Sequence, residues 1–106
     1  MTYSTKSNVK PILEIEISET TYDTELDNCV KAAYAWVNKI LKKHGFSVPL
    51  STPVDDTIVY AEAYKAASIF RRRRAPPAEV DALVEQAKDF LAVYIEAEKE
   101  ATLKRV

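Results

Sequence analysis

Apolar residues recur with the period of an α-helix over three long stretches, and this spacing restricts the fold more than any other feature of the sequence. The clearest stretch predicts a helix that starts at a cap on Thr20 or Thr21 and ends at Gly45. Its expected buried face consists of Leu26, Cys29, Val30, Ala33, Val37, Ile40 and Leu41. Gly45 is the only glycine, which excludes a glycine-rich phosphate-binding loop.

The other two periodic stretches predict a central helix and a long last helix. The order Thr52-Pro53-Val54-Asp55 is typical of a helix start, with threonine as the cap and proline at the first helical position. That helix is rich in alanine, which favours close packing at the centre of a bundle. The last helix is expected from Pro77 to about Arg105. At 1.5 Å per residue it would be about 42 Å long, so its final turns should project.

The first twenty residues give a weaker pattern. Pro11 is expected to prevent a regular helix interior and to push Lys10 toward an extended conformation. We therefore predict a short helical turn near residues 5–13. The alternation of apolar and acidic residues from Leu13 to Ile17 then predicts a short, half-buried strand.

Together these patterns predict one all-α domain spanning residues 1–106. It should be a small bundle of three main helices, preceded by an N-terminal arm (residues 1–20) that combines a helical turn with an extended segment. Residues 96–106 should form a projecting C-terminal tail. The length fits one domain, because 106 residues and 47% hydrophobic content suffice for a single core.

The residues that usually carry chemistry are scarce. Cys29 is the only cysteine, so no intrachain disulfide is possible, and His44 is the only histidine. Both belong to one helix about 22 Å apart, too far for a nucleophile and its base. We expect Cys29 to be a buried structural thiol and Asp55 and Asp56 to cap a helix. The sequence predicts no enzyme activity, no cofactor and no metal site.

Charge is balanced overall but unevenly distributed. Fifteen Lys and Arg oppose sixteen Asp and Glu, which disfavours a nucleic-acid coat or a membrane-surface protein. No segment is apolar enough for a signal peptide or a membrane span, and the single cysteine fits a reducing cytoplasm. Residues 57–74 hold five cations against one acid, whereas residues 79–106 hold seven acids against four cations. Regions of opposite sign suit self-association or a charged partner.

The most distinctive motif is the run Arg71, Arg72, Arg73 and Arg74. Cations at the C-terminal end of a helix suit its dipole, but four in a row exceed what the dipole needs. Three interpretations remain open. The arginines could be solvated or paired within the chain, they could contact acids across a protein interface, or they could bind nucleic-acid phosphates.

The order and spacing of these segments resemble the head–tail connector adaptor proteins of tailed phages and related viruses. The likeness covers roughly residues 9–95. It includes the opening Val9-Lys10-Pro11-Ile12-Leu13-Glu14-Ile15, the acidic helix start Thr21-Tyr22-Asp23-Thr24-Glu25-Leu26, and the alanine-rich helix from Ile58 to Arg73.

The resemblance implies a structural virion protein without enzymatic activity, assembled in the host cytoplasm. Such adaptors form a ring, usually of about twelve copies, below the portal protein. The ring extends the channel through which genomic DNA passes without sequence-specific binding, and it docks the tail or a stopper protein. Arg71, Arg72, Arg73 and Arg74 would then pair between subunits or line the channel. The tail would grip the portal through Glu96, Glu100, Leu103, Lys104, Arg105 and Val106.

Two alternatives come from other classes of protein. A small helical nucleic-acid-binding regulator could use the Arg71–Arg74 run, but its recognition helix should carry polar residues that read bases. The alanine-rich central helix lacks that character. A generic helical dimerisation module is the second alternative, and it would bury the last helix in a stable dimer.

Overall fold

The computed structural model describes residues 2–104, with residues 102–104 described by their backbone alone. Within this range the chain forms four helices: α1 (Lys6–Ile12), α2 (Asp23–Lys43), α3 (Asp56–Arg71) and α4 (Pro77–Lys104). The described residues contain no strand. The predicted all-α fold with a long C-terminal helix is confirmed.

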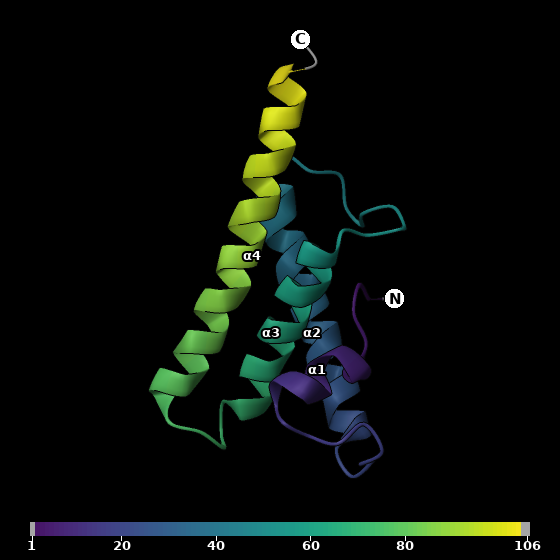
Figure 1. Ribbon diagram of the computed structural model, residues 1–106, viewed down its shortest axis with the longest axis vertical. Coiled ribbons are helices and arrows are strands. Elements are labelled where there is room, and N and C mark those ends of the chain that lie inside the picture. Colours follow the sequence, from purple (N-terminus) through teal and green to yellow (C-terminus); the bar gives the residue numbers. More distant parts are fainter. Residues whose placement is uncertain (1, 105–106) are drawn as a thin grey trace.

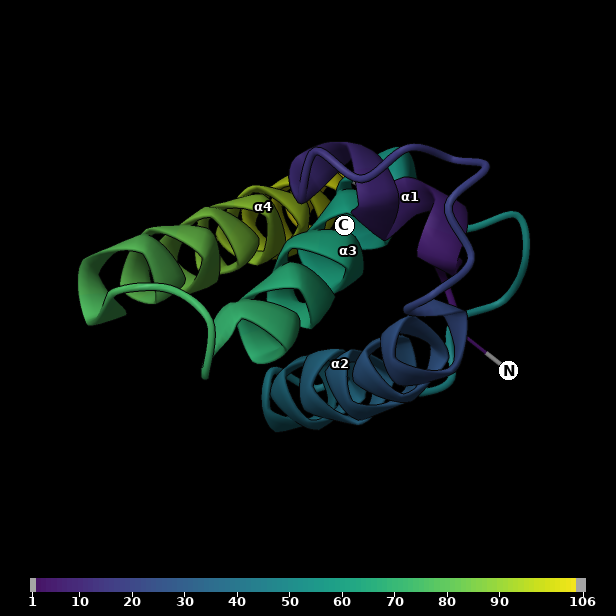
Figure 2. The same cartoon turned by 90° about the horizontal axis from the view of Figure 1, so that it is seen from below.

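α3 is the centre of the bundle, as its composition predicts. α2 and α4 pack against α3 from different sides, and α1 lies across α3 and the start of α2 (Figures 1 and 2). Four alanines of α3 are fully buried and let the neighbouring helices approach closely: Ala61, Ala63, Ala66 and Ala67.

α4 sets the length of the molecule. Its 28 residues correspond to about 42 Å, close to the longest dimension of 50 Å. The C-terminal end of α4 extends past the ends of the other helices (Figure 1). The expected projection is therefore present, and it makes the final turns accessible from several sides.

The core has two parts joined along α3. The first lies between α1, the start of α2 and the end of α3, and it includes Val9, Leu26 and Phe70. The second lies between the end of α2, the start of α3 and α4, and it includes Leu41 and Ile95. The connection between α2 and α3 closes the second part with Phe46, Val48 and Leu50.

The predicted conformation of the N-terminal arm is partly wrong. A helix does form at Lys6–Ile12, but it contains Pro11, and Lys10 is helical rather than extended. Pro11 lies near the end of a seven-residue helix, where it removes little backbone hydrogen bonding, and burial of Val9 and Lys10 fixes the helix. Residues 13–17 form a turn and irregular backbone instead of a strand. The reason is that residues 2–104 provide no second strand to pair with them.

Two predicted helix starts are also displaced. α2 begins after Tyr22, because the hydroxyl and backbone N–H of Thr21 both donate to Glu19 instead of capping the helix. α3 begins at Asp56 instead of Pro53. Asp55 caps it by accepting a hydrogen bond from the Thr57 N–H at 2.8 Å. This capping role agrees with the one expected for Asp55.

The end of α2 confirms the role expected for Gly45. Its φ is +90°, a left-handed conformation that glycine adopts without strain. The Phe46 N–H donates to the Leu41 carbonyl at 3.0 Å, and the Gly45 N–H donates to the Lys42 carbonyl at 3.1 Å. This pair of bonds is a Schellman motif, which stops the helix and turns the chain back toward the core.

Candidate interaction surfaces

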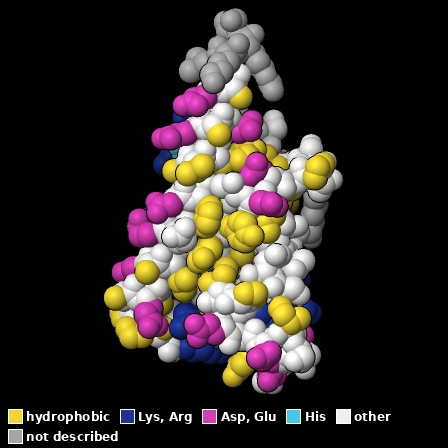
Figure 3. Space-filling view, viewed as in Figure 1, with side chains coloured by type: hydrophobic (Ala, Val, Ile, Leu, Met, Phe, Trp, Pro, Cys, Tyr) yellow, Lys and Arg dark blue, Asp and Glu magenta, His cyan; other side chains and the backbone are white. Residues whose placement is uncertain are grey.

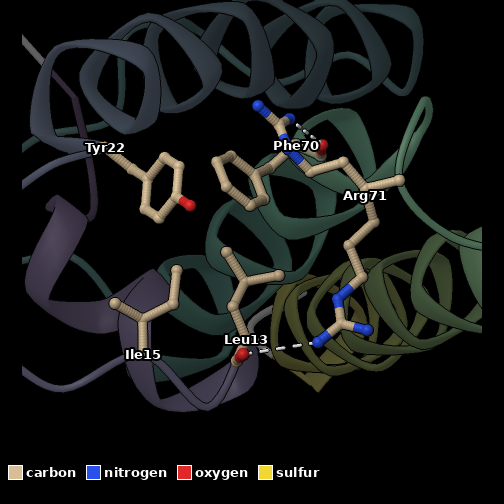
Figure 4. Close-up of a pocket in the computed structure, with 6 residues that line it drawn as sticks. Leu13, Ile15, Tyr22, Phe70 and Arg71 are labelled. Atoms are coloured by element: carbon tan, nitrogen blue, oxygen red, sulfur yellow. Dashed lines mark hydrogen bonds between the residues drawn. The ribbon is translucent and has the colours of Figure 1, made fainter.

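The arginine run lies at the end of α3 and in the turn that leads to α4. Arg71 is the last helical residue and points across the bundle (Figure 4). Its guanidinium donates to the Leu13 carbonyl at 3.3 Å and lies 3.5 Å from a carboxylate oxygen of Glu79. Arg71 therefore links α3 to the segment after α1 and to the first turn of α4.

Arg74 is also used within the chain. Its Nη1 donates to the Phe70 carbonyl at 2.8 Å, and its Nη2 lies 2.9 and 2.7 Å from the two carboxylate oxygens of Glu25. The guanidinium carbon is 4.2 Å from the centre of the Phe70 ring. Arg74 thus ends α3 and ties it to α2 through a carbonyl, a carboxylate and an aromatic face.

A hollow of about 220 Å³ separates the two inward-turned arginines (Figure 4). Tyr22 and Phe70 form one side, with their rings in an edge-to-face contact and their centres 5.5 Å apart, and Leu13 and Ile15 form another side. The lining supplies apolar surface and two guanidinium groups already bound to oxygen atoms. It supplies neither a carboxylate nor an imidazole, so it lacks an obvious general base.

Arg72 and Arg73 are exposed, as Arg74 is, but they differ from Arg71 and Arg74 in their contacts. In the described part of the chain, neither has a carboxylate within ion-pair distance. Arg71 and Arg74 hold the turn on both sides of them. Two cations are therefore presented at a fixed position, available to an acidic partner.

The expected portal-binding tail begins where α4 leaves the core. Ile95 is buried, whereas residues 96–100 are all exposed. Glu96 and Glu100 therefore have accessible side chains. Leu103 and Lys104 belong to α4 by their backbone, but their side chains, and the whole of Arg105 and Val106, lie outside the described residues.

A groove of about 400 Å³ lies between α2 and α4 on the side away from α1. Its floor is apolar, with Ile40, Leu91 and Ile95, and Lys88 and Lys99 stand along it. The remaining residues that line it are His44, Ala92 and Glu96. An acidic helix with an apolar edge would match this lining better than a basic one.

Lys65 of α3 is a cation that sequence reasoning missed. Its ammonium nitrogen lies 4.9 Å from the centre of the Trp36 ring on α2. Burial lowers the pKa of Lys65, and the positive charges of Arg72 and Lys88 lower it further. Lys65 therefore lies in a positively charged environment. The only sequence signal was a lysine among the alanines of the central helix.

Glu62 is the second residue that sequence reasoning missed. It is fully buried on α3. Its Oε1 accepts hydrogen bonds from the Ser4 N–H at 2.8 Å, the Ser4 hydroxyl at 2.7 Å and the Tyr3 N–H at 3.1 Å. Burial raises the pKa of Glu62, and the bonds from Ser4 and Tyr3 oppose that rise. The carboxylate holds the N-terminal arm and is closed to solvent.

Hydrophobic side chains are visible along the middle of the face shown in Figure 3, and aromatic residues of α3 and α4 form a strip of their own. The rings of Tyr60 and Tyr64 on α3 each lie 5.7 Å, centre to centre, from Phe90 on α4. Tyr60 is 49% exposed, so the strip is open to a partner. Near its end, Ile12 and Leu83 line a shallow hollow of about 370 Å³ next to the Arg71–Glu79 pair.

The remaining predicted sites have simple local roles. Cys29 is buried as expected, and burial raises the pKa of its thiol. Among the described side chains, no three His, Cys, Asp or Glu residues cluster closely enough to hold a metal ion. Of the described helices, none combines the length and apolarity needed to cross a membrane. Comparison with protein-family models, with curated proteins and with solved structures gave no match to the chain.

Proposed function

We propose that this chain is a head–tail connector adaptor. In this role it forms a ring of about twelve copies below a viral portal, extends the DNA channel, and docks the tail or a stopper protein. It is a structural virion component that acts through its surfaces, without catalysis and without reading DNA sequence. The proposal combines the resemblance of the sequence with the placement of its charged side chains.

The observation that carries the proposal is the exposure of Arg72 and Arg73 on a turn fixed by their neighbours. Arg71 binds Leu13 and Glu79, and Arg74 binds Phe70 and Glu25. The two central arginines are left pointing outward at a defined place. In a ring, each copy would place these cations against acids of the next copy, which is a heterologous contact.

The end of α4 supports the second part of the proposal. Residues 96–100 extend beyond the core with every side chain exposed. A helix end that contributes little to its own core can be bound by another protein without unfolding the bundle. We assign the tail from Glu96 onward to contact with the portal.

The native mass of the protein in gently released particles tests this function directly, with nuclease added before the measurement. A particle-bound, nuclease-resistant ring of about a dozen chains would support the connector function. A complex that nuclease disperses would instead favour the nucleic-acid-binding regulator. A free dimer that buries α4 would favour the dimerisation module.

A charge-reversal pair tests the arginines. Arg72→Glu combined with Arg73→Glu should block particle assembly while leaving the helix content unchanged, because both side chains are exposed. Arg72→Lys combined with Arg73→Lys keeps the charge and should retain assembly at a reduced level. Normal particles from the glutamate variant would remove the arginines from the proposed contact.

A further inference from the structure

One face of α2 is basic along its last two-thirds. From Lys31 to Lys43 this helix contains four lysines and no acid. At 100° per residue the lysines fall within an arc of about 120° on the side opposite the buried stripe. All four are exposed: Lys31, Lys39, Lys42 and Lys43. We call this surface the basic face of α2.

One face of α4 is acidic along most of its length. Five exposed carboxylates fall within an arc of about 100°, again opposite the buried stripe: Asp81, Glu85, Asp89, Glu96 and Glu100. Acidic side chains follow the outer edge of α4 in Figure 3. The apolar Val93 lies beside them and is 60% exposed. We call this surface the acidic face of α4.

The lysines of α4 do not interrupt this acidic face along its middle. Lys88 and Lys99 both line the groove toward α2, at the border of the arc. The ammonium nitrogen of Lys88 lies 3.7 Å from a carboxylate oxygen of Glu85. Lys88 therefore pairs with Glu85 and not with the other four acids of the face. The acidic face is therefore mainly negative, with Lys88 and Lys99 along its edge toward α2.

The two faces cannot meet within one molecule. α3 lies between α2 and α4, and the outer surfaces of those helices point away from each other (Figure 2). A second copy, however, can present its basic face to the acidic face of the first. The second copy then offers its own acidic face to a third. Such a contact joins two different surfaces and repeats from copy to copy, and it gives a ring when the rotation between copies closes.

We propose that the acidic face of α4 in one copy binds the basic face of α2 in the next copy. This inference rests on the proposed ring function and names the contact that would build the ring. The basic face can lie entirely on the acidic face, because Lys31–Lys43 spans about 18 Å and Asp81–Glu100 about 28 Å along their helices. Val93 supplies an apolar point at the centre of the contact.

Lys65 of α3 adds a cation beside α2, because its ammonium nitrogen lies 4.9 Å from the centre of the Trp36 ring. Exposed ion pairs are individually weak, so the association should depend on several of them acting together. Salt should weaken the association strongly, because these charges are exposed to solvent.

Two reversed variants test the contact in the full chain. The first, Glu85→Lys with Asp89→Lys, makes the α4 face basic. The second, Lys39→Glu with Lys42→Glu, makes the α2 face acidic. The wild-type chain should associate at millimolar concentration in about 0.01 M salt, where the Debye length is about 30 Å. Each variant alone should associate about tenfold or more weakly, as measured by sedimentation equilibrium.

Mixing the two variants supplies the decisive arm. In the mixture, the basic α4 face of the first variant can bind the acidic α2 face of the second variant. The mixture should therefore regain the association that neither variant shows alone. Glu14→Lys with Glu16→Lys is the matched control for the first variant, since it also changes the net charge by +4 but lies away from both faces. That control should associate like the wild type.

Three results would overturn the inference. They are a wild-type chain that stays monomeric under these conditions, association that survives both reversals, and a mixture that fails to regain association. The inference and the proposed function can fail separately. Rescue by mixing, in a protein that virus particles do not contain, would keep the contact and remove the connector function. Particles with normal rings from both reversed variants would keep the function and remove the contact.

Discussion

Glu62 shows how one residue can fix the start of the chain. Its carboxylate is buried and accepts hydrogen bonds from the backbone of Tyr3 and from both donors of Ser4. Replacing it with alanine leaves these donors without a partner. We expect Glu62→Ala to lower the free energy of unfolding by about 1–3 kcal/mol and to expose residues 2–5 to proteolysis.

Glu62→Gln is the matched control, because its amide oxygen can keep the bonds from Ser4. Denaturant unfolding of the two variants gives the comparison. Equal stability of wild type and Glu62→Ala would show that the arm is not held by this carboxylate.

The raised pKa of Glu62 gives a prediction about pH. The folded chain holds a proton on Glu62 at pH values where the unfolded chain has lost it. The contribution of Glu62 to the free energy of unfolding should therefore be fully present below about pH 4.5. It should decrease as pH rises above that value. Glu62→Gln carries no titrating proton, so its unfolding should lack this decline. An identical pH profile for both proteins would contradict the assignment.

At the scale of elements, Lys10 connects α1 to the long segment that precedes α2. It is 3% exposed, and its ammonium group donates to the carbonyls of Ile17 and Glu19 at 3.0 and 2.7 Å. It also lies 2.9 Å from a carboxylate oxygen of Asp23. We expect Lys10→Met to cost about 2 kcal/mol, because both carbonyls and the carboxylate lose a charged partner.

Acid titration gives the second readout for Lys10. The ammonium group of Lys10 beside the carboxylate is the largest cause of the lowered pKa of Asp23. The stabilisation from this ion pair is present above about pH 3.8 and is lost as pH falls through the lowered pKa of Asp23. In Lys10→Met, the free energy of unfolding should therefore decrease less steeply as pH falls in this range. Lys6→Met is the control, since Lys6 is more exposed and lies 3.7 Å from Asp23. It should cost about 0–1 kcal/mol.

The elements also show which parts of the fold local sequence can predict. The stripes of α2 and α4 are regular over many turns, so their existence and approximate ends follow from periodicity. α1 and the start of α3 do not follow from it. Pro11 is held in a helix by the burial of its neighbours, and Asp55 outcompetes Thr52 as a cap. These outcomes depend on tertiary contacts that a local pattern does not contain.

The candidate surfaces divide in the same way. The Arg71–Arg74 run is visible in the sequence, but its division into two paired and two exposed arginines depends on Leu13, Glu25 and Glu79. Glu62 resembled any other helical acid, because its burial comes from residues far away in the chain. The lysines of α2 and the acids of α4 could have been found from sequence as two helical faces of opposite sign.

At the scale of the whole molecule, α4 has one part that packs in the core and a second part that is exposed. Up to Ile95 it completes the second part of the core against α3. Beyond Ile95 the side chains from 96 to 100 are exposed, so they bury little apolar surface. The boundary between the part of α4 that builds the core and the part that we propose to bind a partner therefore falls within one continuous helix.

Deleting residues 96–106 tests this boundary. The shortened chain should stay folded, with a melting temperature within about 5 °C of the full chain, because the lost residues add little to the core. The helical signal in circular dichroism should decrease only by the amount that the deleted helical turns contribute. Deleting residues 90–106 is the contrasting variant, since it removes Leu91 and Ile95 from the core and should unfold the bundle. Cooperative folding of the first variant, joined to loss of particle assembly, would place the final turns in binding. Unfolding of that variant would place them in the core instead, and the portal contact would then have to be sought elsewhere on the surface.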